Sequence, residues 1–489
     1  MNETLLLRAE FLLPLSRSGG RDRRIADGYV LSRGRVVEEV GPWDEAVERR
    51  LAPAIRSGAV EVIGGLTEEG APVKVPGILL PAFVKAHGHD HESPIIGVAK
   101  DEPLTDWLDH AVNLFTGFMG EKREALERAF GCSPNLVAYR KARLDDLSFG
   151  ITSSMVHHCN HNKYRIEEIF EANREAGTRM ILAVGSQDRH YDDRILDTPD
   201  QAVARLDAAN ERFSDRDMFQ VIPGPDQFFS NGPELLKALK DWSRRNGTLI
   251  HIHSSEEPRT TAWFRETYGM TPVAYGASIG FLDDRTVLAH QVNCTDEDLD
   301  LLQETGTRVV HNPLANTILG SGMPPVVEML ERRIPLAIST DGSGSADNQN
   351  IINAARLASQ YQKAFHRNAR LLTAQQVLEM ITCIPADMLG LNVGELAPGR
   401  EADFVLVDTR APNMTPTRLD NCVENLIWAA SGNEIRYVVG AGRVLVDDYR
   451  FRSLDAQEIL SQVQALSERF VAYRASAEEI QKTGARSGE

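Results

Sequence analysis

Short runs of apolar and β-branched residues recur through the middle of the chain, separated by longer stretches with helical spacing. This alternation predicts parallel strands connected by crossover helices. Eight runs are present, at 78–89, 151–158, 179–188, 218–226, 248–256, 286–292, 308–313 and 335–342. Eight is the strand number of a (β/α)₈ barrel, so the pattern predicts an α/β fold with a TIM-like barrel over residues 76–394.

The two ends of the chain have a different pattern. Residues 1–75 and 395–450 contain short apolar runs joined by glycine-containing turns, as in GYVLSRGRVV and IRYVVGAGRVLV, which is typical of hairpins. We expect the two pieces to form one small composite β-sandwich domain. Residues 451–489 are expected to form a C-terminal helix and tail. Four apolar residues recur there near helical spacing: Ile459, Val463, Leu466 and Phe470.

Polar side chains stand at the carboxyl ends of the predicted strands, where barrel enzymes place their chemistry. His87 and His89 are two residues apart, so strand alternation puts both imidazoles on one face, where they can bind one ion. His253 and His290 end two later runs, and Asp341 follows the eighth. A buried aspartate needs a positive neighbour. Together these residues predict a metal centre at the rim of the barrel.

Glu256 lies three residues after His253, where the chain leaves the predicted strand for the next loop. From this position its carboxylate can reach a substrate bound above a metal ion. The alternative is that Glu256 caps the following helix or lies in its first turn, which the sequence SSEEP also fits. The residues alone leave both interpretations open.

Five motifs, in this order, resemble the amidohydrolase superfamily, in the branch with cytosine, guanine and S-adenosylhomocysteine deaminases and the triazine hydrolases. They are PAFVKAHGHDH, HIHSSE, AHQV, HNPLAN and STDG. The resemblance covers nearly the whole chain and implies one divalent metal ion with these ligands: His87, His89, His253 and Asp341. Zinc suits three imidazoles and a carboxylate, with iron(II) or manganese as alternatives.

The resemblance also implies a reaction. Glu256 and His290 match the acid–base pair of the deaminases, and a bound divalent ion makes hydroxide available near neutral pH. Asp341 would take the proton of the water, His290 would orient the hydroxide, and Glu256 would shuttle protons to a ring nitrogen and to ammonia. The function implied is hydrolytic deamination of an amino-substituted heterocycle or nucleoside-like small molecule. Two alternatives stay open, namely hydrolysis of an amide, urea or C–Cl bond, and a non-catalytic barrel scaffold.

Six further residues are candidates for substrate contact: Trp107, His157, Asp226, Gln227, His311 and Asn316. The sequence PGPDQ places Asp226 or Gln227 where many deaminases of this branch have histidine, and HNPLAN lacks the serine of the related motif. The substrate therefore cannot be assigned from the resemblance. Residues 103–130 are long for a connection in a barrel. They either line one wall of the pocket or pack on the barrel as a helical hairpin.

Composition narrows the choice of partner. The chain has 489 residues, with 53 Lys and Arg against 70 Asp and Glu, giving a formal charge of −17. Such an excess of acid disfavours nucleic acid and anionic membrane surfaces. No apolar run is long enough for a transmembrane helix or a signal peptide, and the five cysteines form no CxxC pair. We expect a cytoplasmic enzyme for a small molecule, and the resemblance implies a homodimer.

Overall fold

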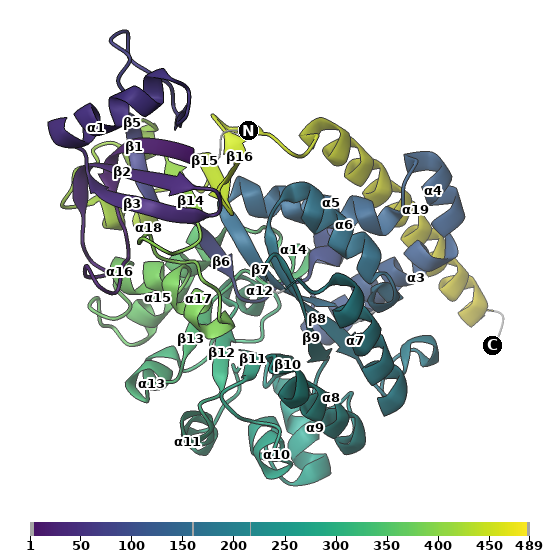
Figure 1. The fold of residues 1–489 in the computed structure, drawn as a ribbon. Coiled ribbons are helices and arrows are strands. Elements are labelled where there is room, and N and C mark those ends of the chain that lie inside the picture. Colours follow the sequence, from purple (N-terminus) through teal and green to yellow (C-terminus); the bar gives the residue numbers. More distant parts are fainter. Residues whose placement is uncertain (1–3, 159–160, 216, 487–489) are drawn as a thin grey trace.

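The computed structural model describes residues 4–158, 161–215 and 217–486. Strands from both chain ends form one nine-stranded sheet, with β5 joined to β1 on one side and to β14 on the other. In Figure 1 the purple N-terminal strands and the yellow-green C-terminal strands lie together beside the barrel. The strands are β1 (Thr4–Leu12), β2 (Ile25–Arg33), β3 (Val36–Pro42), β4 (Glu61–Ile63), β5 (Val75–Pro81), β14 (Phe404–Val407), β15 (Ile435–Gly440), β16 (Arg443–Asp447) and β17 (Arg450–Phe451).

This sheet has its own apolar core. Leu7 of β1, Leu79 of β5 and Leu406 of β14 are fully buried in one cluster, so residues almost 400 positions apart in the chain exclude water together. The composite β-domain predicted from the two chain ends is confirmed.

The barrel consists of two four-stranded parallel sheets in sequence order. Its strands are β6 (Phe83–Lys85), β7 (Ile151–His158), β8 (Arg179–Ser186), β9 (Phe219–Pro225), β10 (Ile250–Ser254), β11 (Thr286–His290), β12 (Arg308–His311) and β13 (Leu336–Ile338). A parallel bridge from Gln227 to His253 connects the two sheets on one side. On the other side the Ser339 hydroxyl bonds to both the backbone N–H and the carbonyl of His87, at 3.1 and 2.7 Å. The predicted (β/α)₈ order is confirmed.

The first predicted run, 78–89, divides into two strands. β5 ends at Pro81 in the composite sheet, and β6 begins at Phe83 in the barrel. Between them the backbone changes partners, because the N–H of Ala82 donates to the Asp403 carbonyl and that of Phe83 to the Gly150 carbonyl. The run is continuously apolar because both strands are buried, so hydrophobicity alone cannot mark the boundary.

Helix α1 (Glu45–Arg56) packs with Leu51 and Ile55 against the composite sheet, and most of the other helices surround the barrel and follow its strands. The early ones among these others are η1 (Asp90–Ile95), α2 (Leu104–Trp107), η2 (Leu108–Asn113), α3 (Leu114–Glu121), α4 (Arg123–Phe130), α5 (Pro134–Ser148), η3 (161–164), α6 (Ile166–Ala176), η4 (Asp193–Ile195), α7 (Pro199–Phe213) and α8 (Pro233–Asn246). The later ones are α9 (Pro258–Tyr268), α10 (Pro272–Ser278), α11 (Asp296–Thr305), α12 (Pro313–Ile318), α13 (Val326–Glu331), α14 (Ser343–Ala346), α15 (Ile351–Phe365), α16 (Ala374–Glu379), α17 (Cys383–Leu389), η5 (Pro412–Met414), α18 (Cys422–Trp428) and α19 (456–486).

Residues 103–130 line one wall of the pocket and also pack against a neighbouring helix. Trp107 and Leu108 line a cavity at the barrel rim, whereas Phe115 and Phe118 pack against Phe470 of the C-terminal helix, with ring centroids 5.1 and 5.7 Å apart. Figure 1 shows α19 running alongside α3, α4 and α5. In the part of the chain that the structure describes, none of the helices is both long and apolar enough to cross a bilayer.

Candidate metal centre and active site

Four predicted ligands converge at the carboxyl ends of the strands. His87 and His89 follow β6, His253 lies in β10, and Asp341 follows β13. The Nε2 atoms of His89 and His253 are 3.1 Å apart, and Oδ1 of Asp341 lies 3.2 Å from Nε2 of His87 and 3.5 Å from Nε2 of His89. Strands far apart in the sequence therefore bring three imidazoles and one carboxylate to one point.

The side chains present fit a divalent cation. Both ring nitrogens of His87 are buried without a hydrogen-bond partner among the described residues, which is costly unless something binds them. Burial holds the pKa of His87 and of His89 well below the usual range for histidine, so both rings keep the lone pairs that a metal requires. Three groups of residues bring potential ligand atoms close together. They are His87, His89 and His253; His87, His290 and Asp341; and His157, Asp226 and His253.

Backbone carbonyls behind the site fix two of the rings. Nδ1 of His253 lies 2.8 Å from the carbonyl of Asp226, and Nδ1 of His89 lies 3.2 Å from the carbonyl of His157. An Nδ1–H that donates to a carbonyl leaves Nε2 unprotonated and turned toward the metal. The tautomer that binds a cation is therefore selected by the fold itself.

Asp341 is held in an uncommon backbone conformation, with φ at 71°. The N–H of Gly342 donates to its Oδ1 at 2.8 Å, and the Gln349 amide donates to its backbone carbonyl at 3.0 Å. Gln349 in turn accepts hydrogen bonds from Thr340 at 2.7 Å and from Lys85 at 3.1 Å. These contacts fix the carboxylate before any cation binds.

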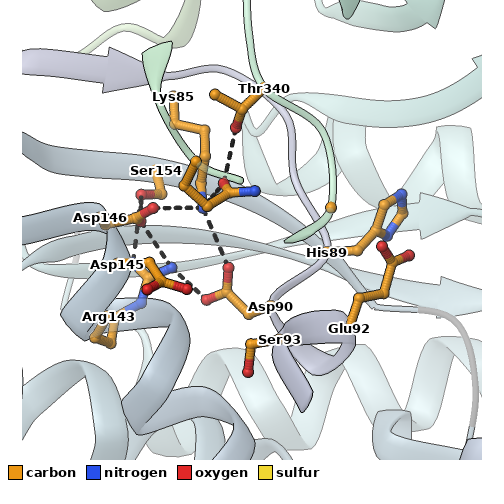
Figure 2. A network of polar contacts seen from close by, with 12 residues as sticks. Lys85, His89, Asp90, Glu92, Ser93, Arg143, Asp145, Asp146, Ser154 and Thr340 are labelled. Carbon is orange, nitrogen blue, oxygen red and sulfur yellow. Dashed lines mark hydrogen bonds and ion pairs between the residues drawn. The ribbon is translucent and has the colours of Figure 1, made fainter. Parts of the chain in front are cut away.

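Lys85 belongs to a buried network of charges beneath the ligands, shown in Figure 2. Its ammonium lies 2.7 Å from Asp146 and 3.3 Å from Asp90. Arg143 pairs with the same two carboxylates, at 3.0 Å from Asp146 and in a close contact with Asp90. Two positive and two negative groups balance, so none is left buried without a partner. No motif around Lys85, two residues before His87, predicted that it joins such a network.

Glu256 and His290 lie next to each other beside Asp341. Nε2 of His290 is 3.4 Å from Oε2 of Glu256 and 3.8 Å from Oδ2 of Asp341. The Asn316 amide donates to Nδ1 of His290 at 3.0 Å, which leaves the ring proton on Nε2, facing the carboxyl groups. Burial, together with the charge of Asp341, raises the pKa of Glu256 well above its usual value, and burial lowers the pKa of His290 to about 4. The raised pKa favours the protonated form of Glu256, which can donate a proton.

Glu256 does not cap the next helix. The N-cap of α9 is Glu257, whose side chain makes no capping bond, and α9 begins at Pro258. Glu256 instead lines the cavity above the metal ligands. The structure therefore places Glu256 in the site and not at the start of the helix.

The cavity has two parts. The inner chamber, of about 50 Å³, is lined by the metal ligands His89, His253 and Asp341 together with Glu256 and His290. The outer chamber has about 460 Å³. Five residues line both chambers: Leu104, Leu108, Asn113, Tyr191 and Gln227. A water molecule occupies roughly 30 Å³, so only the reacting edge of a substrate fits the inner chamber, and the rest extends outward.

The six predicted substrate contacts divide into two sets. Trp107, Asp226 and Gln227 line the inner chamber. His157, His311 and Asn316 are fully buried and do not line it among the described residues. The backbone carbonyl of His157 lies against Nδ1 of His89, and the Asn316 amide donates to His290. Contact of His157, His311 and Asn316 with a substrate stays a prediction.

Sequence reasoning missed three residues of the inner chamber. Glu92, in the motif HGHDHES, resembled a loop residue but is only 3% exposed. Ser345 donates hydrogen bonds to it, and Tyr191 donates one to Asp226. Burial and the charge of Asp341 raise the pKa of Glu92 to about 8. Glu92 could have been predicted because it is a charged residue close in sequence to the two histidines His87 and His89. Nothing in the sequence indicated Ser345 or Tyr191.

His311 gives a test of burial at this end of the barrel. Burial lowers the pKa of His311 to about 3. Between this value and the pKa of a free histidine, the ring is protonated in the unfolded chain but neutral in the native state. The free energy of unfolding should fall by about 1.4 kcal/mol per pH unit on this account as pH drops from about 6.5 toward 3. Denaturant unfolding of metal-free wild type and His311→Gln at pH 7.5 and 5.5 measures the difference. Equal slopes in the two proteins would contradict the burial of a neutral ring.

A (β/α)₈ barrel with converging imidazole and carboxylate ligands and a buried acid–base pair defines a metal-dependent hydrolase. The chain belongs to the amidohydrolase family, whose model matches residues 78–445.

Two relatives and one solved structure illustrate the similarity. The 5-methylthioadenosine/S-adenosylhomocysteine deaminase of Desulfovibrio desulfuricans is 31% identical over 391 residues, covering 80% of this chain and 84% of the relative. The 5'-deoxyadenosine deaminase of Methanothermobacter thermautotrophicus is 30% identical, covering 79% and 86%. The crystal structure of atrazine chlorohydrolase from Arthrobacter aurescens TC1 with zinc has a TM-score of 0.82 at 23% identity, covering 95% of this chain and all of that one.

Proposed function

We propose that this protein is a hydrolytic deaminase that releases ammonia from an amino-substituted heterocycle or nucleoside-like small molecule. The observation that carries the proposal is the Glu256–His290 pair, with Nε2 and Oε2 3.4 Å apart and directly beside Asp341. Expelling ammonia requires a proton donor for a ring nitrogen and for the leaving group. Two relatives at 30 and 31% identity are named deaminases of adenosine derivatives, which supports the same reaction class.

The roles of the residues follow from their positions. A divalent ion held by His87, His89, His253 and Asp341 supplies a water of lowered pKa. Asp341 accepts a proton from the attacking water, and its Oδ2 lies 3.8 Å from Nε2 of His290, which orients that water. Glu256, whose raised pKa favours the protonated form, donates its proton to the ring nitrogen. The proton that Asp341 took from the water goes to the departing amine, which leaves as ammonia, and the hydroxyl group added to the ring carbon gives its proton back to Glu256 as the carbonyl forms.

We propose a single ion, with zinc as the metal. Three imidazoles and one carboxylate make a set that zinc favours. The strand-4 end reads VIPGPDQ, with no lysine or glutamate of the kind that bridges two ions in binuclear members of the superfamily. The zinc in the atrazine chlorohydrolase crystal structure is consistent with this proposal.

The test is release of ammonia from a panel of purines, pyrimidines, pterins, their nucleosides and amino-triazines, with metal content determined on the same protein. We expect ammonia from at least one nucleoside-like compound. Fully metallated protein that releases none would overturn deamination, and assays of amides, ureas and chloro-triazines would then identify the bond cleaved.

We also propose, from the resemblance to the superfamily, that the enzyme is a homodimer in the cytoplasm. Sedimentation equilibrium checks the oligomeric state.

A further inference from the structure

Glu92 is a buried acid in the inner chamber that the proposed reaction does not use. It lies in η1, three residues after the ligand His89, and is 3% exposed. In Figure 2 its carboxyl group points away from the ion network, to the side where His89 lies. It therefore faces the substrate chamber and has no structural partner among the buried cations beneath.

One oxygen of this carboxyl group is fixed by three donors. Oε2 accepts hydrogen bonds from the N–H groups of Gly344 and Ser345, at 3.2 and 3.1 Å, and from the Ser345 hydroxyl at 3.3 Å. Gly342 makes room for it, since a Cβ there would lie 1.9 Å from Oε2. The glycine-rich loop after Asp341 therefore holds the carboxyl group of Glu92 in place.

The other oxygen, Oε1, has no donor among the described residues. Three bonds hold Oε2 on the loop side, and Glu92 lines the inner chamber, so Oε1 is the oxygen available to a ligand there. Asp226, by comparison, already accepts a hydrogen bond from Tyr191. Glu92 is therefore the acid of the chamber with a fixed acceptor left over for a ligand.

The charge of the inner chamber indicates what that ligand is. Its described lining includes four carboxylic acids, Glu92, Asp226, Glu256 and Asp341, and no lysine or arginine. Carboxyl oxygens are hydrogen-bond acceptors, so this lining favours a ligand that presents N–H donors. The outer chamber has a mixed polar lining that includes Asp109, His190 and Arg194, and Arg194 pairs with Asp192 at 2.6 Å, so a polar substituent fits at that end.

We propose that Glu92 is a specificity-determining residue that accepts, at Oε1, a hydrogen bond from a second nitrogen donor on the substrate ring. The substrate class is then a heterocycle with an N–H or amino donor in addition to the amino group that leaves. This inference rests on the proposed function for the identity of the leaving group. A ligand donor at Oε1 favours the charged form of Glu92, as does neutralisation of Asp341 by a cation.

Glu92→Gln gives a sharp test because the amide is not symmetric. The N–H groups of Gly344 and Ser345 require an acceptor, so the amide oxygen would take the place of Oε2 and the NH₂ group would face the chamber. A donor would then oppose the donor of the ligand. Glu92→Met removes the acceptor without adding a donor, and so distinguishes loss of a bond from repulsion.

The experiment compares binding of ligand pairs that differ by one amino group and lack the leaving group, so that no turnover is needed. The pairs are purine ribonucleoside with and without an amino group at position 2 or 8, used where the ammonia assay detects no release from either member. Calorimetry on metal-loaded protein measures the affinity ratio within each pair. In at least one pair, wild type should favour the amino member by at least about tenfold.

Glu92→Gln should abolish or reverse that preference, and Glu92→Met should reduce the ratio to near one. The matched control is Glu257→Gln, because Glu257 is equally buried but bonds to Thr105 at 2.9 Å and does not line the inner chamber. It should keep the wild-type ratio. Metal content and the thermal midpoint of each variant establish that it is folded.

The outcomes separate this inference from the proposed function. Ammonia release without any Glu92-dependent preference rejects the role of Glu92 alone. A Glu92-dependent preference without ammonia release from any heterocycle rejects deamination alone. A preference that survives both substitutions of Glu92 overturns the inference.

Discussion

Replacing Glu256 with glutamine is expected to lower kcat by about 100-fold or more while the metal stays bound. The carboxyl group is buried 3.4 Å from Nε2 of His290, and its pKa is raised well above the usual value, so it carries the proton that the ring nitrogen needs. Glutamine keeps the size and the polarity of the side chain but has no transferable proton. Steady-state kinetics on the best substrate of the ammonia panel, with metal analysis on the same sample, measures both effects.

Glu257→Gln provides the control for this prediction. Glu257 is the neighbouring acid and is 5% exposed, but it is held by Thr105 outside the inner chamber. We expect kcat in this variant to stay within a few-fold of wild type. Normal turnover in Glu256→Gln would remove Glu256 from the proton path, and loss of metal in that variant would show that its role is to support the ligands.

Replacing His253 with alanine is expected to remove most of the bound metal and, with it, most of the turnover. Its Nε2 lies 3.1 Å from Nε2 of His89, and the carbonyl of Asp226 holds the ring in the tautomer that leaves Nε2 free. With this ring removed, three ligands are left, and the imidazole that faces His89 is absent. Metal content by atomic emission and the activity of the same sample are the two measurements.

His110→Ala is the matched control for His253→Ala, because it removes a histidine whose side chain is 55% exposed and bonds only to Glu102 at 2.7 Å. Its metal content and activity should equal those of wild type. Full metal and full activity in His253→Ala would contradict the ligand assignment. Activity that returns with excess zinc would still support it, since weaker binding is the expected defect.

The sequence by itself determined the barrel and the main elements of the site. Strand and helix periodicity are local properties, so eight apolar runs predicted the eight barrel strands. Polar residues at the ends of these runs predicted where chemistry would gather, because the carboxyl ends of parallel strands meet at one rim. The candidates His87, His89, His253, His290 and Asp341 were identified in this way. The resemblance to the superfamily implied the four ligands among them, and the structure places these four together.

Only the tertiary structure decided which polar residues face the cavity. Asn316 and His157 were predicted to contact the substrate; in the structure the Asn316 amide donates to His290 and the backbone carbonyl of His157 lies against His89, contacts that the sequence did not indicate. Glu92 was not among the predicted site residues and is buried against a loop more than 250 positions away. The reason is physical: periodicity reports the local environment of a segment, whereas burial and hydrogen bonding depend on partners that the fold brings from distant parts of the chain.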